Sequence, residues 1–154
     1  MLQKLLKVLG IIGIIIVIGL AGALGKNIVS GLFSTTKPSQ QQREATLIEG
    51  FTATANQTNL KLPIMVDKDT RMDKVTVGPG PRVVYHQTMV NYTSSDLDAM
   101  EFQTNIRQNV SRNVCSNSDM KPSLQLGGIY TYLYYGIDGV EAARVEIRRK
   151  DCEL

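Results

Sequence analysis

The most constraining feature of the sequence is an uninterrupted apolar segment near its start. Val8–Leu24 contains no charged or strongly polar side chain. Counted from Leu5, the segment is about 20 residues long, which at roughly 1.5 Å per residue matches the hydrocarbon core of a bilayer. Because lipid offers no partners to backbone amides, such a segment must be helical to span it. We therefore predict a single transmembrane helix.

The charges beside this segment predict its orientation. Lys4 and Lys7 precede it, whereas only Lys26 follows it closely. The positive-inside rule then leaves the N-terminus in the cytoplasm and places the C-terminal domain in the periplasm, tethered to the inner membrane. The alternative is a cleaved export signal, since a basic start, an apolar core and the small residues Ala21–Ala23 also describe one. That alternative predicts a soluble periplasmic protein.

The sequence divides into three parts. Residues 1–26 are the predicted cytoplasmic stub and transmembrane signal-anchor, residues 27–42 a linker rich in Ser, Thr and Gln, and residues 43–154 a periplasmic domain. Three of the 17 Lys and Arg lie in the first part, and none of the 14 Asp and Glu precedes Glu44, so the net charge of +3 belongs to the membrane segment. The neutral remainder lacks the basic excess that a phosphate backbone requires, and we expect no nucleic-acid partner.

Hydrophobic periodicity predicts an α+β domain after the linker. Apolar residues at spacings of three and four predict two helices, one after Ser39 and one after Ser94–Asp96, where Ser39 and Ser95 can cap the first turns. The break at Asn117–Pro122 ends the second helix. Segments dense in β-branched and aromatic residues predict strands at 60–66, 74–77, 82–92, 129–137 and 140–149. The predicted fold is an N-terminal transmembrane helix followed by a small domain with a mainly antiparallel sheet packed on one or two helices.

Two turns are expected from glycine and proline. Gly78–Pro81 predicts a reversal between neighbouring strands. Asp138-Gly139 predicts a two-residue hairpin turn, because both central residues of the favoured turn need positive φ. Such a turn places three tyrosines and three aliphatic residues on one face of the last two strands, in the pairs Tyr130 with Ile147, Tyr132 with Val145 and Tyr134 with Ala143.

These three tyrosines have two interpretations. In the first, Tyr130, Tyr132 and Tyr134 pack the sheet against the helix that carries Phe102 and Ile106. In the second they form an aromatic interaction surface, because tyrosine offers a large contact area with a polar tip and is enriched at protein interfaces. The burial of the rings distinguishes the two.

Cys115 and Cys152 are the only cysteines. Two cysteines in an exported protein predict one disulfide, since the compartment is oxidising. This bond would tie the C-terminus to the second helix and stabilise the fold by about 4 kcal/mol. The alternative is a pair of unconnected thiols.

No group of residues forms a catalytic or metal-binding signature. The single histidine, His86, lies in a predicted strand without a partner set of ligands or a neighbouring nucleophile. Asp67, Asp69 and Asp73 resemble a calcium loop only loosely, because the central glycine and the terminal bidentate Glu are missing. We therefore expect no catalytic residue, metal, cofactor or small-molecule substrate.

Several short motifs resemble a family of small exported, inner-membrane-anchored proteobacterial proteins of unknown function. The matching residues are Leu62–Asp67, Thr70–Arg71, Gly78–Gly80, Tyr85, Val90–Asn91, Val114–Cys115 and Tyr130–Gly139. The resemblance implies export and supports the disulfide. Our hypothesis is a non-enzymatic, membrane-tethered interaction module, either an accessory subunit of an envelope assembly or a binder of another exported protein. The alternatives are a secreted periplasmic protein with an enzymatic or small-ligand-binding activity, and a structural envelope protein.

Overall fold

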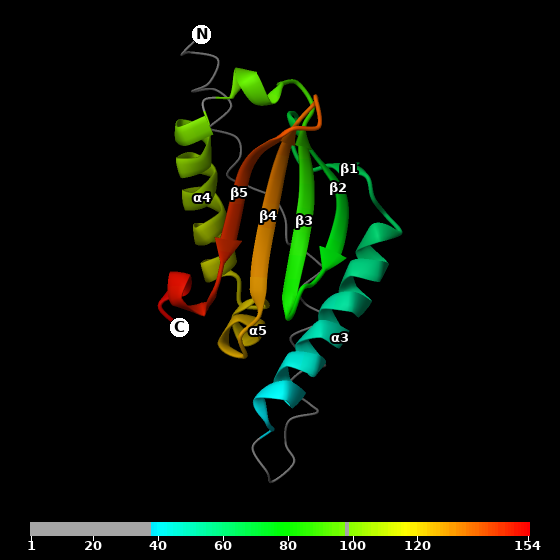
Figure 1. Ribbon diagram of the computed structural model, residues 1–154, viewed down its shortest axis with the longest axis vertical. Helices are drawn as coiled ribbons and strands as arrows, with labels where there is room; N and C mark the ends of the chain where they lie inside the picture. The colour runs from blue at the N-terminus through cyan, green and yellow to red at the C-terminus, as the bar shows by residue number, and fades with distance from the viewer. Residues whose placement is uncertain (1–37, 98) are drawn as a thin grey trace.

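The structure is a computed structural model that describes residues 38–97 and 99–154. Its strands form one sheet in the order β1-β2-β3-β4-β5 (Figure 1). Three of the four neighbouring pairs are antiparallel and β3–β4 is parallel. The elements are α3 (Gln40–Asn59), β1 (Ile64–Met65), β2 (Thr70–Val77), β3 (Arg82–Met89), η1 (Ser94–Asp96), α4 (Ala99–Ser116), α5 (Lys121–Gln125), β4 (Ile129–Gly136), β5 (Glu141–Ile147) and η2 (Arg149–Cys152). The predicted α+β class with a mainly antiparallel sheet is confirmed.

The predicted transmembrane segment and most of the predicted linker lie outside the described residues. Within 38–97 and 99–154, no helix is both long and apolar enough to cross a membrane. The linker prediction is wrong at its end, because Gln40–Gln42 form the first turn of α3. A capping box begins this helix: Ser39 Oγ accepts from the Gln42 amide at 3.2 Å, and Gln42 Oε1 accepts from the Ser39 amide at 2.8 Å.

The two long helices pack on the same face of the sheet. Phe51 of α3 meets the ring of Tyr130 edge to face, with centroids 5.7 Å apart, and Phe102 of α4 meets Tyr134 in the same way at 6.0 Å. Tyr130 and Tyr134 lie on one face of β4, because side chains alternate along a strand. The helices therefore share one layer, with α3 over β2 and β3 and α4 over β5 (Figure 1).

The parallel pair β3–β4 results from the crossover between these strands. The chain leaves β3, runs through η1, α4 and α5 beside the sheet, and returns as β4 in the same direction. Parallel neighbours need such a connection, whereas antiparallel neighbours need only a tight turn. The predicted reversal at Gly78–Pro81 connects β2 and β3, and Gly78 N donates to Arg82 O at 2.8 Å.

In the last hairpin the three tyrosines have the predicted partners, but the turn that connects the strands is not the predicted two-residue turn. The loop has three residues, Ile137–Gly139, since Gly136 N donates to Val140 O. This turn alone would shift the register by one residue. A bulge between Tyr134 and Tyr135 in the register leaves Ala142 without a partner and restores the pairs of Tyr130, Tyr132 and Tyr134 with Ile147, Val145 and Ala143.

Other boundaries differ from the prediction. The strand expected at 60–66 is reduced to β1, the strand expected at 74–77 begins earlier, at Thr70, and the strand expected at 82–92 ends at Met89. Ser94–Asp96 form a separate 3-10 turn, in which Asp96 Oδ2 accepts from the Thr93 amide at 2.8 Å. Within the segment expected to be a break, Pro122 lies in the first turn of α5, where its missing amide costs nothing.

Candidate protein-binding surface

The three tyrosines of β4 are core residues. Tyr130, Tyr132 and Tyr134 are between 2% and 6% exposed, and Tyr132 stacks on Tyr85 with centroids 4.9 Å apart. Burial raises the pKa of Tyr130 to about 12 although its hydroxyl bonds Ser123 Oγ at 2.7 Å. The interpretation as an interaction surface is therefore wrong, because rings packed under two helices offer no area to a partner.

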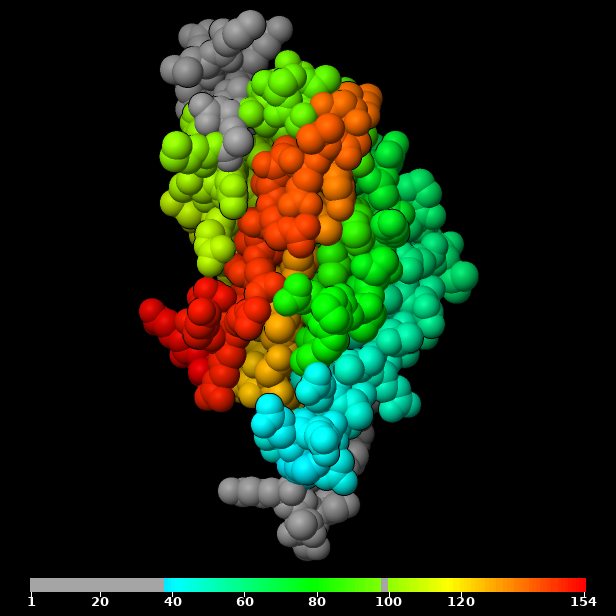
Figure 2. All heavy atoms as spheres, viewed as in Figure 1, coloured from blue at the N-terminus to red at the C-terminus, as the bar shows by residue number. Residues whose placement is uncertain are grey.

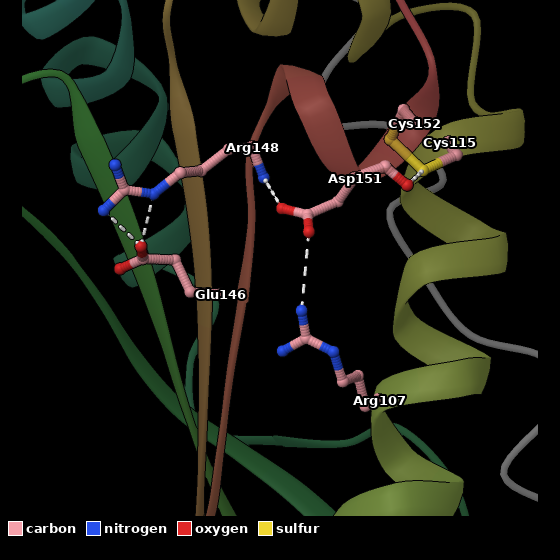
Figure 3. Close-up of polar contacts among 6 residues, drawn as sticks. All are labelled: Arg107, Cys115, Glu146, Arg148, Asp151 and Cys152. Atoms are coloured by element: carbon pink, nitrogen blue, oxygen red, sulfur yellow. Dashed lines mark hydrogen bonds and ion pairs between the residues drawn. A yellow bond between two sulfur atoms is a disulfide. The ribbon is translucent and has the colours of Figure 1, made fainter.

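The two cysteines form a disulfide that ties η2 to the last turn of α4 (Figure 3). Their Cα atoms lie 5.1 Å apart, within the range that a disulfide spans. Asp151, the residue before Cys152, caps η2 by accepting from the Arg148 amide at 2.8 Å and pairs with Arg107 of α4 at 3.4 Å. The C-terminal turn is thus held by one covalent bond and one carboxylate.

His86 lies on the sheet face opposite the helices. Its Nε2 lies 3.0 Å from Thr76 Oγ1, and its ring is parallel to that of Tyr135, with centroids 6.1 Å apart. Burial and the neighbouring charge of Lys74 lower the pKa of His86. The imidazole thus lies between the Thr76 hydroxyl and the ring of Tyr135, in a polar cluster on this face of the sheet.

The carboxylates of the aspartate-rich segment are used by the turn between β1 and β2. Asp67 Oδ1 accepts from the amides of Asp69 and Thr70, both at 2.8 Å. Asp69 accepts from Asn91 Nδ2 at 2.8 Å and pairs with Lys68. Among the described residues, no group of three or more His, Cys, Asp or Glu could hold a metal ion. The carboxylate of Asp67 accepts from backbone amides two and three residues later, as in an Asx turn, and so stabilises the turn between β1 and β2.

A patch of exposed apolar side chains lies at the β1 edge of the sheet. Leu60, Ile64 and Met65 are 86%, 43% and 51% exposed, and we call these three residues the apolar edge. Figure 2 shows this part of the chain in teal and green at the right margin of the molecule. Large apolar side chains that gather at one place on a surface mark interaction sites, whereas scattered ones do not. The sequence pattern missed this patch, because 60–66 was predicted to be a paired strand.

The apolar edge covers both sides of β1. Ile64 pairs with Met72, whose side chain is in the core, and Met65 pairs with Arg71, which lies on the opposite face. Successive side chains of a strand point to opposite faces, so Ile64 and Met65 flank the edge from two sides. Val66, which is 9% exposed, anchors the segment in the core. Val66 therefore holds β1 in place while the side chains of Ile64 and Met65 remain accessible to a partner.

The charged groups around the apolar edge carry both signs, because Lys68 pairs with Asp69 and Arg71 pairs with Asp73. Lys61 is exposed, and the side chains of Lys68 and Arg71 are 54% and 43% exposed. Asn59 closes the backbone edge of β2 beyond β1 by bonding both the amide and the carbonyl of Val75 at 2.8 Å. Because β1 has only two residues and Asn59 already bonds Val75 of β2, few unpaired backbone groups remain at this edge for the addition of another strand. Side-chain contacts from an apolar segment suit this surface better.

Comparison with known proteins identifies the fold. No protein-family model matches the sequence, and no curated protein matches it in sequence. A protein of Pseudomonas aeruginosa described as secreted superposes with a TM-score of 0.60 at 20% identity, over 71% of this chain and 96% of that one. The pilotin EpsS of the Vibrio vulnificus type 2 secretion system superposes with a TM-score of 0.59 at 12% identity, over 73% and 96%. The type II secretion pilotin AspS of Vibrio cholerae gives 0.58 at 15% identity, over 75% and 100%.

Proposed function

We propose that this chain is a non-enzymatic accessory protein of a bacterial envelope assembly that binds another protein through the apolar edge. The single observation that carries the proposal is the exposure of Leu60, Ile64 and Met65, three large apolar side chains within six residues of the chain at the edge strand. The likeness to two pilotins of type II secretion systems supports the class of function, since these are accessory proteins of such an assembly. A secretion-system component is the partner class that this likeness favours.

The chemistry of the apolar edge defines the partner's segment. Full burial of a large aliphatic side chain contributes about 1.5–3 kcal/mol, so three anchors give a substantial part of an interface. Lys61, which follows Leu60, adds an exposed positive charge, whereas Lys68 and Arg71 are paired with Asp69 and Asp73. The partner should therefore present apolar residues with an Asp or Glu placed to meet Lys61, because complementary charge sets orientation and raises the rate of association.

In this proposal the N-terminal apolar segment determines where in the cell envelope the domain lies. Val8–Leu24 is long enough to anchor the chain in the inner membrane, with α3 starting 14 residues after the last of its flanking lysines, Lys26. An anchored domain stays near the membrane-embedded part of an assembly and gains effective concentration for its partner. The mass of the intact chain purified from membranes tests this point: an unprocessed N-terminus is expected, and a chain that begins near Leu24 would show a cleaved export signal instead.

Site-specific photo-crosslinking tests the binding surface. A photoreactive phenylalanine analogue at Met65, in the full-length chain in its native membrane, should crosslink one protein in high yield. The matched control is the same analogue at Gln125, which is exposed on α5 at the other end of the sheet. Equal crosslinking from both positions, or a crosslink from Gln125 alone, would place the interface elsewhere and overturn the proposal.

A further inference from the structure

A second surface lies at the base of the sheet, where β4 begins and β5 ends. A pocket of about 420 Å³ opens there, lined by Gly127, Gly128, Ile129, Arg148, Arg149, Lys150 and Leu154. Three of these residues are consecutive cations, and none carries an acidic side chain. The pocket therefore combines positive charge with apolar side chains in one concavity.

The cations of the pocket are held by the C-terminal turn. The disulfide fixes η2 to α4, and Asp151 caps the turn at the Arg148 amide while it pairs with Arg107 (Figure 3). Arg148 also pairs with Glu146 at 2.5 Å. These contacts place Arg149 and Lys150 at the pocket before any ligand arrives, and pre-ordered groups bind with a smaller entropy loss.

Arg149 and Lys150 are two exposed cations of the pocket. Neither forms a salt bridge with an Asp or Glu among the described residues, and both are exposed. Arg149 Nε donates to Leu154 O at 2.5 Å. This bond orients the guanidinium and does not involve its two terminal nitrogens. A guanidinium and an ammonium side by side bind phosphate oxygens well.

The pocket lies at the end of the domain from which the chain leads to the predicted anchor. Ile129 N donates to Pro81 O at 2.9 Å, and the neighbouring Gly80 lies close to Glu44 in the first turns of α3. Figures 1 and 2 show the red C-terminal turn and the cyan start of α3 at the same lower end of the molecule. The predicted tether therefore joins the domain at the same end as the pocket.

From this geometry we infer that the pocket binds the phosphate-bearing headgroup of an anionic phospholipid of the tethering membrane. Arg149 and Lys150 contact the phosphate, and Ile129 and Leu154 contact the apolar glycerol and acyl portion. A free inorganic phosphate would use the cations alone and leave the apolar lining without a role. The inference rests on the proposed tether for its location, and it is independent of the apolar edge.

Native mass spectrometry of the full-length chain in a neutral detergent tests this inference. Phosphatidylglycerol and phosphatidylcholine are added in separate titrations, and the lipid-bound fraction is measured for the wild type and for the double variant Arg149→Gln/Lys150→Gln. The wild type should prefer phosphatidylglycerol, and the double variant should lose affinity for it by about fivefold per charge removed. Arg112→Gln, which removes an exposed cation of α4 outside the pocket, should bind like the wild type.

The same spectra contain the outcomes that overturn the inference. Equal binding of the two lipids by the wild type excludes an anionic headgroup site, and this result needs no variant. Unchanged binding by the double variant with its disulfide mass intact places the lipid elsewhere. Displacement of phosphatidylglycerol by an equal concentration of inorganic phosphate shows a free-phosphate site. The spectra also report whether the N-terminus is intact, so failure of the tether is seen separately from failure of the pocket.

Discussion

Asn59, the last residue of α3, bonds both backbone groups of Val75 in β2. Its Nδ2 donates to Val75 O and its Oδ1 accepts from Val75 N, each at 2.8 Å. β1 pairs only with Met72 and Arg71, so the amide occupies part of the β2 edge that β1 does not reach. Open strand edges pair with other chains and aggregate. One side chain therefore closes the sheet where the edge strand is too short.

Asn59→Ala should lower the free energy of unfolding by about 1–3 kcal/mol, because it leaves a buried amide and carbonyl unpaired. Urea unfolding measures this loss. Asn56→Ala, at an exposed position one turn earlier on α3, is the matched control and should change stability by less than about 0.5 kcal/mol. Equal effects of the two substitutions would show that the helix, not the edge contact, is responsible.

The disulfide should contribute about 4 kcal/mol, as expected for a closed loop between cysteines 37 residues apart. The double variant Cys115→Ser/Cys152→Ser is compared with the wild type by urea unfolding, with and without reductant. Reductant should lower the stability of the wild type towards that of the variant, whose own stability should not respond. A wild type that is insensitive to reductant while the free thiols are detected would contradict the structural role.

Gly136→Ala should destabilise the domain by about 1–3 kcal/mol through overpacking. A Cβ on Gly136 would collide with the backbone amide of Ser94 and with Asp138, whose carboxylate accepts from that amide and from the Ser94 hydroxyl. The control is Gly139→Asn, since Gly139 has open space and a φ of +75° that Asn tolerates. Thermal unfolding should give a clearly lower midpoint for Gly136→Ala, and the reverse order would contradict this packing.

His86 should make stability depend on pH below its ordinary pKa of 6.5. Burial, Lys74 and Arg144 lower the pKa and Asp73 raises it, so the folded state binds the proton less readily than the unfolded state. Stability should therefore fall as pH decreases from 6.5 through the lowered pKa. His86→Gln should remove this component of a pH series of unfolding free energies. Identical pH slopes for variant and wild type would exclude the histidine as the cause.

Elements with strong local signals could be predicted from the sequence. α3 begins directly after Ser39 because its capping box is encoded within four residues, and the apolar spacing of α4 is regular. The faces of the last hairpin also follow from alternation along the strand. The predicted faces are correct although the turn is one residue longer than expected, because the unpaired Ala142 shifts the register back by one residue.

Features that depend on distant contacts could not be predicted. The parallel pairing of β3 with β4 joins segments separated by two helices, so no local pattern encodes it. β1 pairs with β2 through Ile64 and Met65 alone, and Leu60 lies at the end of α3 instead of in a strand, so the exposure of these residues depends on tertiary packing. The pocket at η2 needs the disulfide and Asp151 together to bring Arg149 and Lys150 beside Ile129.

The most direct test of the account is affinity purification of the full-length protein from its native membrane, with the accompanying proteins quantified. The wild type is compared with Leu60→Ser/Met65→Ser and with the control Ile137→Ser/Val140→Ser, which removes exposed apolar side chains from the β4–β5 turn. We predict that a stoichiometric partner co-purifies with the wild type and with the control, and that the apolar-edge variant recovers at least about tenfold less of it. A partner retained equally by both variants would contradict a protein interface at the apolar edge.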